Sequence, residues 1–174
     1  MRQDKLDWFV RANLAWDAGR LRSAFNLFMR GAKAGDASCQ LDLAYFYDEG
    51  IGIKPNRLNA QLWYERAFAN GSACAAHNLG LMLLASKDIS AAREWFARAI
   101  QQGEPDSLYE LAKLEIRTHQ VNKARGLLKK LLSNQAIVTP SILTKAKQQL
   151  SRLSRKNSEK KGGGSNVSKL SRSD

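Results

Sequence analysis

The chain of 174 residues is long enough for one compact domain, or for a short array of repeats followed by a tail. Hydrophobic residues make up 44% of it and include four tryptophans, which excludes extensive disorder, while its longest uninterrupted apolar run, Leu79–Ala85, is far below the roughly 18 residues of a membrane span. The formal net charge of +12 indicates either an anionic partner or a solubilising basic segment.

Apolar residues recur at helical spacing along most of the chain, and glycine or proline separates the segments. In chain order, the predicted helices are Asp4–Ala18, Leu21–Ala34, Ser38–Asp48, Leu58–Ala69, Ala73–Ala85, Ser90–Gln102, Pro105–Thr118, Val121–Ser133 and a last helix from Thr139 through Leu153. Pro105 is expected in a first helical turn, where its missing N–H costs nothing. Residues 49–56 hold two glycines and a proline, so a structured loop is expected there.

The composition changes to Ser, Lys, Gly and Arg from about residue 156. We therefore expect a repeat domain at residues 1–155 and a disordered basic tail at residues 156–174, in which Gly162–Ser165 resembles a flexible linker. The N-terminal residues contain charges and no apolar signal-peptide core, so we expect a cytoplasmic protein.

Two segments repeat each other at a step of 32 residues. The first contains Ala60, Trp63, Tyr64, Ala67 and Gly71, and the second contains Ala92, Trp95, Phe96, Ala99 and Gly103. The preceding helices repeat as well, because Leu79-Gly80 lies 32 residues before Leu111-Ala112 and 36 residues after Leu43-Ala44. These steps predict an array of helix pairs in which the 49–56 loop adds four residues to one unit.

Small and large side chains alternate within each predicted pair. Small residues are expected where helices approach closely: Ala24, Ala60, Ala92 and Ala124 on second helices, and Ala44, Gly80 and Ala112 on first helices. Large residues are expected to fill the remaining space: Phe28, Tyr64, Phe96 and Leu128, with Leu27, Trp63, Trp95 and Leu127 beside them. The last amphipathic helix is expected to cap the apolar face of the final pair.

Residues 41–71 resemble a Sel1-like repeat, a relative of the tetratricopeptide repeat. The resemblance rests on Leu-x-Leu-Ala-x-x-Tyr from Leu41, on Gly50-Ile51-Gly52-Ile53, and on Ala-x-x-Trp-Tyr-x-x-Ala from Ala60, followed by Gly71. It implies an all-α, right-handed α-solenoid of about four helix pairs, in which first helices line a concave groove. It also implies an adaptor that holds a partner protein or peptide without chemistry of its own.

The register of such a solenoid selects candidate groove residues on the first helices. The candidates for partner binding are Phe9, Asn13, Trp16, Asp17, Leu41, Tyr45, Asp48, Glu49, His77, Leu81, Leu84, Tyr109, Lys113 and Arg117. Exposed aromatic and arginine side chains are common in binding hot spots, so Trp16 and Tyr45 are the leading candidates. The alternative for Trp16 is packing against the second helix of its own pair.

Few residues suggest chemistry. The two histidines, His77 and His119, have no second ligand at metal-binding spacing, and no phosphate loop or nucleophile elbow occurs, so no metal, cofactor or catalytic residue is expected. Asp48 and Glu49 lie at a helix C-terminus, where the helix dipole disfavours acids, and this placement indicates a salt bridge or a role in binding. Cys39 and Cys74 are interpreted as two small buried thiols, although a disulfide between them is left open.

The positive charge lies in the last third of the chain. Residues 1–116 hold 14 Lys+Arg and 14 Asp+Glu, whereas residues 117–174 hold 14 Lys+Arg and only two acids, which gives 14 − 2 = +12. The candidates for anion or nucleic-acid binding are Lys123, Arg125, Lys129, Lys130, Lys145 and Lys147. Almost no aromatic residue accompanies them for base stacking, which argues against single-strand binding, and solvated helix faces with a soluble tail explain the charge adequately.

Two hypotheses follow. The first is a non-enzymatic adaptor, regulator or immunity-type inhibitor that binds a partner protein in the groove. The second is a nucleic-acid-associated protein that uses its basic C-terminal third.

Overall fold

The computed structural model describes the backbone of residues 2–134 and 138–162, and the side chains of residues 8–134 and 138–155. Within these ranges the chain is all-α. The helices are α1 (Arg2–Asp17), α2 (Leu21–Lys33), α3 (Ala37–Glu49), α4 (Arg57–Ala69), α5 (Ala73–Ala85), α6 (Ile89–Gln101), α7 (Ser107–Arg117), α8 (Val121–Ser133) and α9 (Pro140–Gly162). The predicted fold class, a helical solenoid of the Sel1 and tetratricopeptide type, is confirmed.

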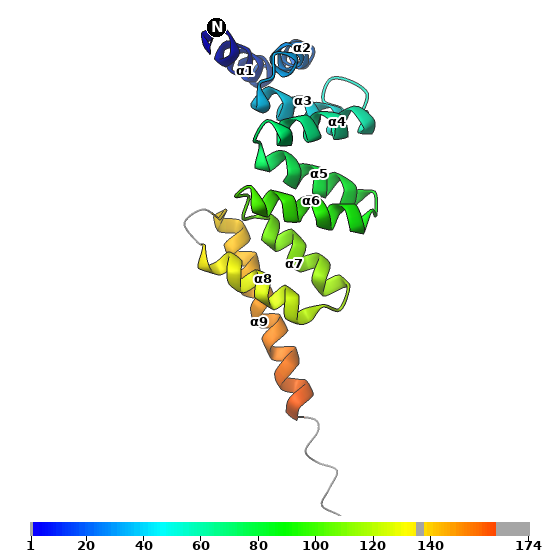
Figure 1. Ribbon diagram of the computed structural model, residues 1–174, viewed down its shortest axis with the longest axis vertical. Helices are drawn as coiled ribbons and strands as arrows, with labels where there is room; N and C mark the ends of the chain where they lie inside the picture. Colours follow the sequence, from blue (N-terminus) through cyan, green and yellow to red (C-terminus); the bar gives the residue numbers. More distant parts are fainter. Residues whose placement is uncertain (1, 135–137, 163–174) are drawn as a thin grey trace, which may run out of the picture. The chain divides into compact units, whose positions relative to one another are not determined.

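The chain divides into two compact units, residues 1–107 and residues 108–174. In the first unit, α1 packs on α2, α3 on α4 and α5 on α6, and α2 and α4 also pack on the first helix of the following pair (Figure 1). In the second unit, α8 packs on α9. We call α1, α3, α5 and α7 first helices, and α2, α4, α6 and α8 second helices.

Polar side chains fix several helix starts. The carboxylate of Asp36 accepts a hydrogen bond from the Cys39 N–H (2.8 Å), and that of Asp88 accepts one from the Ala91 N–H (3.1 Å). The amide oxygen of Asn56 caps α4 in the same way. These side chains satisfy backbone donors that have no partner within their helix, so the boundaries lie close to the predicted ones.

Most predicted boundaries differ from the observed ones by one or two residues, and two of the differences have an informative cause or extent. Pro105 was expected inside a helix, but α7 begins at Ser107. The Glu104 carboxylate accepts a hydrogen bond from the Asp106 N–H (3.2 Å), which holds the preceding residues in a turn. At the other end α9 continues to Gly162, so the helix passes the expected tail boundary at residue 156. Residues 163–174 lie outside the described residues.

The predicted alternation of small and large side chains is confirmed in the core. Ala24, Ala60, Ala92 and Ala124 are fully buried, as are Ala44 and Ala112. Gly80 is buried as well, and a Cβ atom at this position would lie 2.6 Å from the Phe96 ring, so glycine allows the close approach. Phe28, Tyr64, Phe96 and Leu128 are at most 1% exposed, and burial of each contributes roughly 2–3 kcal/mol.

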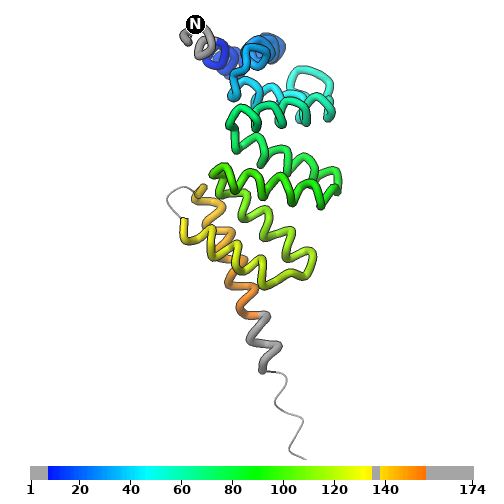
Figure 2. Tube along the Cα trace, viewed as in Figure 1, coloured from blue at the N-terminus to red at the C-terminus, as the bar shows by residue number. Residues whose placement is uncertain are grey.

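The loop between α3 and α4 is wide, whereas α5 and α6 are joined by a tight turn (Figure 2). Gly50 and Gly52 have φ angles of 71° and 67°, in the left-handed region that glycine adopts without strain. The Asn56 N–H donates to the Tyr47 carbonyl (2.8 Å), and a Cβ on Gly52 would lie 2.7 Å from the Cβ of Leu21. The loop is therefore structured, as predicted, and it packs against the start of α2.

Candidate functional site

The candidate site is built on the exposed positions of the first helices of the first unit, α1, α3 and α5, which we call the first-helix face. Steps of 32, 36 and 32 residues relate Ala12, Ala44, Gly80 and Ala112, which all point into the core. The same steps relate Asn13, Tyr45, Leu81 and Lys113, which come one position later. Tyr45 and Leu81 are 37% and 38% exposed. The exposed position therefore holds a different side chain in each first helix, whereas the buried position before it always holds alanine or glycine.

Aromatic side chains from α1 and α3 meet on this face. The Trp16 ring is centred 5.0 Å from Phe46 and 6.2 Å from Phe28 and from Tyr45. Trp16 is half-buried, so it packs against the second helix of its own pair, which was the alternative considered for it. Tyr45 extends this cluster to the surface.

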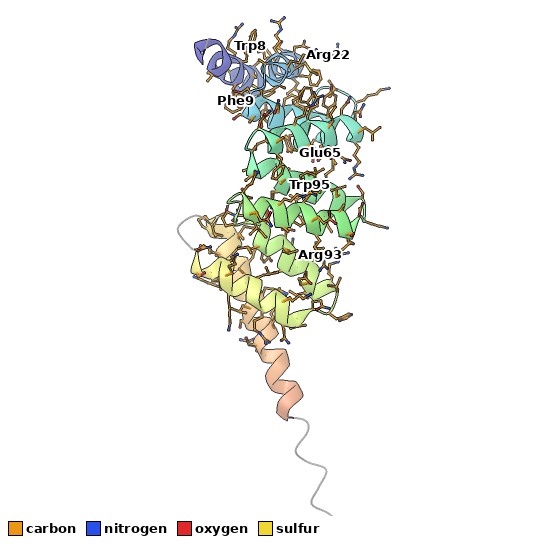
Figure 3. The ribbon with its side chains drawn as sticks, in the orientation of Figure 1. Trp8, Phe9, Arg22, Glu65, Arg93 and Trp95 are labelled. Carbon is orange, nitrogen blue, oxygen red and sulfur yellow. The ribbon has the colours of Figure 1, made fainter. Side chains whose placement is uncertain are left out.

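Phe9 and Asn13 are also half-buried rather than freely displayed. The Phe9 ring is centred 6.3 Å from that of Phe28, and Figure 3 labels both Phe9 and Trp8. The Asn13 side-chain amide donates to the Phe9 carbonyl within α1 (2.9 Å). Asp17, in contrast, is exposed. Among the α1 candidates, Asp17 has the best access to a partner.

The α3 part of the face is acidic. Asp42, Tyr45 and Glu49 recur at helical spacing, and Asp48 lies next to Glu49. Burial, with a smaller effect of Asp36, raises the pKa of Asp42 to about 6. Burial and the neighbouring Glu49 also raise the pKa of Asp48, although Arg57 opposes this shift.

Tyr64 of α4 lies beside the same carboxylates. Burial raises the pKa of its phenol, and the carboxylates of Asp48 and Glu49 raise it further. Asp42 was missed by the sequence analysis, although its spacing of three and seven residues from Tyr45 and Glu49 was the available signal. Acids and an exposed tyrosine thus share one face of α3.

The remaining candidates form internal contacts or belong to the second unit. His77 is half-buried: its Nδ1 lies 2.7 Å from the Ser107 hydroxyl, and its ring is centred 5.7 Å from Phe96. Ser107 is fully buried, so its hydroxyl faces His77 and not solvent. Leu41 and Leu84 are half-buried as well.

In the second unit, Lys113 forms a 2.7 Å salt bridge with Glu110 and lies over the Tyr109 ring. Arg117 is exposed. Lys113 is thereby engaged with side chains of its own helix, which leaves Arg117 the more accessible of the two cations.

The basic candidates are mostly exposed. Lys123, Lys129 and Lys130 lie on the surface of α8, and Lys145 and Lys147 on that of α9. Arg125 differs: it is half-buried, and its Nη2 donates to the Leu153 carbonyl (3.3 Å), which joins α8 to α9. Ala146 and Leu153 are buried, so α9 packs on α8 as the predicted cap.

The two cysteines have different environments. Both are free thiols, but only Cys39 is buried, and the expectation that both are buried is wrong for Cys74. The Cys74 thiol donates to the Glu104 carboxylate (3.2 Å), and partial desolvation of the thiol, together with the Glu104 carboxylate, raises its pKa to about 11. No group of three or more His, Cys, Asp or Glu within the described ranges could hold a metal ion.

Sequence comparison identifies the repeat. The Sel1 repeat profile matches residues 37–72, which form α3 and α4, and residues 75–104, which cover most of α5 and all of α6. The chain contains Sel1 repeats. The resemblance inferred from the 41–71 motif is thereby confirmed, and a second Sel1 repeat lacks the Gly-x-Gly loop. No match was found among curated proteins.

Solved structures with Sel1 or related repeats share this fold. A Sel1 repeat protein from Oxalobacter formigenes is 21% identical with a TM-score of 0.65, and the match covers 75% of this chain and 58% of that protein. A protective antigen of uropathogenic Escherichia coli with an SLR fold is 20% identical with a TM-score of 0.58, over 63% of this chain and 25% of the antigen.

MamA is 16% identical with a TM-score of 0.61, over 98% of this chain and 100% of MamA. This chain spans less than two thirds of the length of the Oxalobacter protein and of the Escherichia coli antigen. At these identities the likeness establishes the fold alone. None of the helices within residues 2–134 and 138–162 combines the length and apolar character that a bilayer-spanning segment requires.

Proposed function

We propose that this Sel1-repeat chain is a non-enzymatic interaction module, of adaptor, regulator or inhibitor type, that binds a partner protein along its first-helix face. Helical repeats of this type are commonly protein-interaction scaffolds. The cytoplasmic location expected from the sequence stays a prediction.

The observation that carries the proposal is the surface of α3. Tyr45 is 37% exposed at the edge of the cluster formed with Trp16 and Phe46. An aromatic side chain supported by a rigid cluster loses little freedom on binding and presents a large contact area. Negative charge is added by α1 and α3, through Asp17, Asp42, Asp48 and Glu49. Such charge favours partners with a basic surface and fixes the orientation in which they bind.

The test uses the immobilised chain to capture proteins from a lysate at two salt concentrations with nuclease present. The captured proteins are identified and quantified by mass spectrometry. The test variant is Tyr45→Ala with Glu49→Lys, because both side chains are exposed and neither is needed for the core. Glu94→Lys is the matched control: it makes the same charge reversal on the exposed side of α6.

We expect a defined protein that is captured by the wild type and by Glu94→Lys, and that is reduced at least tenfold by Tyr45→Ala with Glu49→Lys. Equal capture of the same protein by all three chains would show that α3 is not the binding surface. Trp16 is unsuitable for this test because its substitution also disturbs the packing around Phe28 and Phe46.

A second candidate function is nucleic-acid binding, which the exposed lysines of α8 and α9 favour. Phosphate contacts release counterions, so the affinity for a 30-base-pair duplex should fall steeply with salt. Lys145→Glu with Lys147→Glu should reduce both the affinity and the salt slope in fluorescence anisotropy. If this variant had the same salt dependence of duplex affinity as the wild type, Lys145 and Lys147 would not contact phosphate.

A further inference from the structure

The outer side of α4 carries two exposed leucines. Leu58 is 83% exposed and Leu62 is 41% exposed. They lie four residues apart, so they are neighbours on one helix face. The core side of α4 is formed by Ala60, Trp63, Tyr64 and Ala67, all of them buried. The packing of α4 therefore does not require Leu58 or Leu62.

The equivalent positions in the other helix pairs hold polar residues or glycine. The counterparts of Leu58 are Arg22, Ser90 and Asn122, and the counterparts of Leu62 are Asn26, Glu94 and Gly126. All six are exposed, and Arg22 is labelled on α2 in Figure 3. These two positions are thus in contact with solvent in each of the other three pairs, and among the described second helices α4 alone has leucine at both.

A missing neighbour does not explain these leucines. Such an explanation applies to Leu14 of α1, which is 60% exposed, because its counterparts Phe46 and Met82 are buried. Phe46 packs against Phe28 of the preceding second helix, and α1 has no such helix before it within the described residues. Leu58 and Leu62 lie instead at positions that remain exposed inside the array.

Cations flank the leucine pair in the sequence. Lys54, Arg57 and Arg66 are exposed, whereas Glu65 is the one acid in residues 53–70. Glu65 is half-buried, and its Oε1 accepts a hydrogen bond from the Gln61 amide (2.9 Å). The Arg66 guanidinium, four residues after Leu62, is held 4.6 Å from the centre of the Trp63 ring. The segment around the leucine pair thus combines apolar side chains with exposed cations.

We propose that Leu58, Leu62 and the cations Lys54 and Arg66 form a docking surface for an acidic amphipathic segment of a partner protein. The apolar residues of that segment cover Leu58 and Leu62, and its carboxylates face Lys54 and Arg66. This surface is separate from the first-helix face, because it lies on the outer side of a second helix. The chain can therefore hold two different segments at once.

The probe is a fluorescein-labelled 15-residue peptide with leucines at i, i+4 and i+7 and glutamates flanking them. A second peptide has lysine at each glutamate position. Binding to the full chain is measured by fluorescence anisotropy. We expect the acidic peptide to bind at least tenfold more tightly than the lysine peptide.

Two variant pairs separate the apolar contribution from the charge. Leu58→Ser with Leu62→Asn introduces residues that the array already uses at these positions, and should weaken acidic-peptide binding at least tenfold. Its control, Val10→Ser with Leu14→Asn, removes another exposed apolar pair and should change binding less than twofold. Arg66→Gln should weaken binding about threefold, whereas Arg98→Gln, which removes an equivalent cation over Trp95, should not.

Four results would overturn the proposal. The first is equal binding of both peptides, and the second is unchanged binding by Leu58→Ser with Leu62→Asn. The third is a wild-type dimer in light scattering that this variant dissociates, which would assign the surface to a second copy of the chain. The fourth is binding to anionic phospholipid vesicles, but not to the acidic peptide, which would assign it to a membrane surface.

Discussion

The two Sel1 repeats, residues 37–72 and 75–104, share a core and differ at their surfaces. Ala60 and Ala92 are both fully buried, and Tyr64 and Phe96 occupy one equivalent large position. Arg66 and Arg98 lie over Trp63 and Trp95 at 4.6 and 4.4 Å from the ring centres. The core therefore repeats because every pair must fill the same space between helices.

The surfaces of these repeats differ in three places. Helix α3 carries three acids, whereas α5 carries no charged residue. The outer face of α4 has Leu58 and Leu62, whereas that of α6 has Ser90 and Glu94. The α3–α4 loop is also longer than the α5–α6 turn. Because the shared core leaves these positions free, they are where recognition by the 37–72 repeat can arise.

The largest expected effect tests the shared core. Phe96→Ala and Tyr64→Ala should each lower the free energy of unfolding by about 3–5 kcal/mol, because both side chains are buried and leave a cavity. Urea denaturation followed by circular dichroism measures this loss. Glu94→Ala on the exposed side of α6 is the control and should cost less than about 0.5 kcal/mol. A loss below about 1 kcal/mol for Phe96→Ala would contradict the packing described.

The second prediction concerns the acidic side of α3. The folded pKa of Asp42, about 6, lies above its ordinary value of 3.8, so the folded chain binds this proton more tightly than the unfolded chain. Well below pH 4 the carboxyl is protonated in both states. Its ionisation then destabilises the fold progressively between pH 4 and 6, by at most about 3 kcal/mol.

Asp42→Asn should remove this penalty. The unfolding free energy of the variant minus that of the wild type should rise between pH 4 and 6 and stay constant above that range. Denaturation curves of both proteins at pH 4, 5, 6 and 7 measure the difference. A difference that is independent of pH would show that burial does not shift this carboxyl.

The third prediction concerns one core position at which the two repeats differ, Ala44 in α3 and Gly80 in α5. The methyl group of Ala44 is accommodated in the core, whereas a methyl group at Gly80 would lie against the Phe96 ring. Gly80→Ala should therefore destabilise the chain by about 1–2 kcal/mol, even though alanine favours helix by about 1 kcal/mol. In a Phe96→Leu background the cost should be smaller, because the close ring contact is gone. Additive effects of the two substitutions would argue against that contact.

The smallest expected effect lies in the tight turns. Lys87 and His119 have φ angles of 66° and 59°, and their counterpart between α1 and α2 is Gly19, with φ of 70°. Lys87→Gly should raise stability by about 0.5–1 kcal/mol, because glycine adopts this conformation without a steric penalty. Gly19→Ala is the reciprocal test and should lower stability by a similar amount. Thermal unfolding can resolve both changes, and a loss of stability in Lys87→Gly would contradict the argument.

Much of the fold could be predicted from the sequence because repetition reveals spacing. The 32-residue step from Ala60-Trp63-Tyr64 to Ala92-Trp95-Phe96 identified the helix pairs, and two helices, Ala73–Ala85 and Val121–Ser133, have the predicted bounds. Glycine, proline and capping residues act within a few positions of the chain, so they fix the turns locally. The start of α7 was misplaced because the side chain of Glu104 decides it, and not the position of Pro105.

Side-chain exposure was the part that only tertiary structure decided. Trp16 belongs with the core because Phe28 and Phe46, from two other helices, lie against it. Cys74 is exposed, Asp42 is half-buried, and Leu58 and Leu62 are uncovered, although helical periodicity alone assigns none of these states. The sequence by itself determined the repeat, the small and large core positions and the location of the basic charge. Burial depends on which neighbouring helix reaches a given face, and only the packed helices settle that.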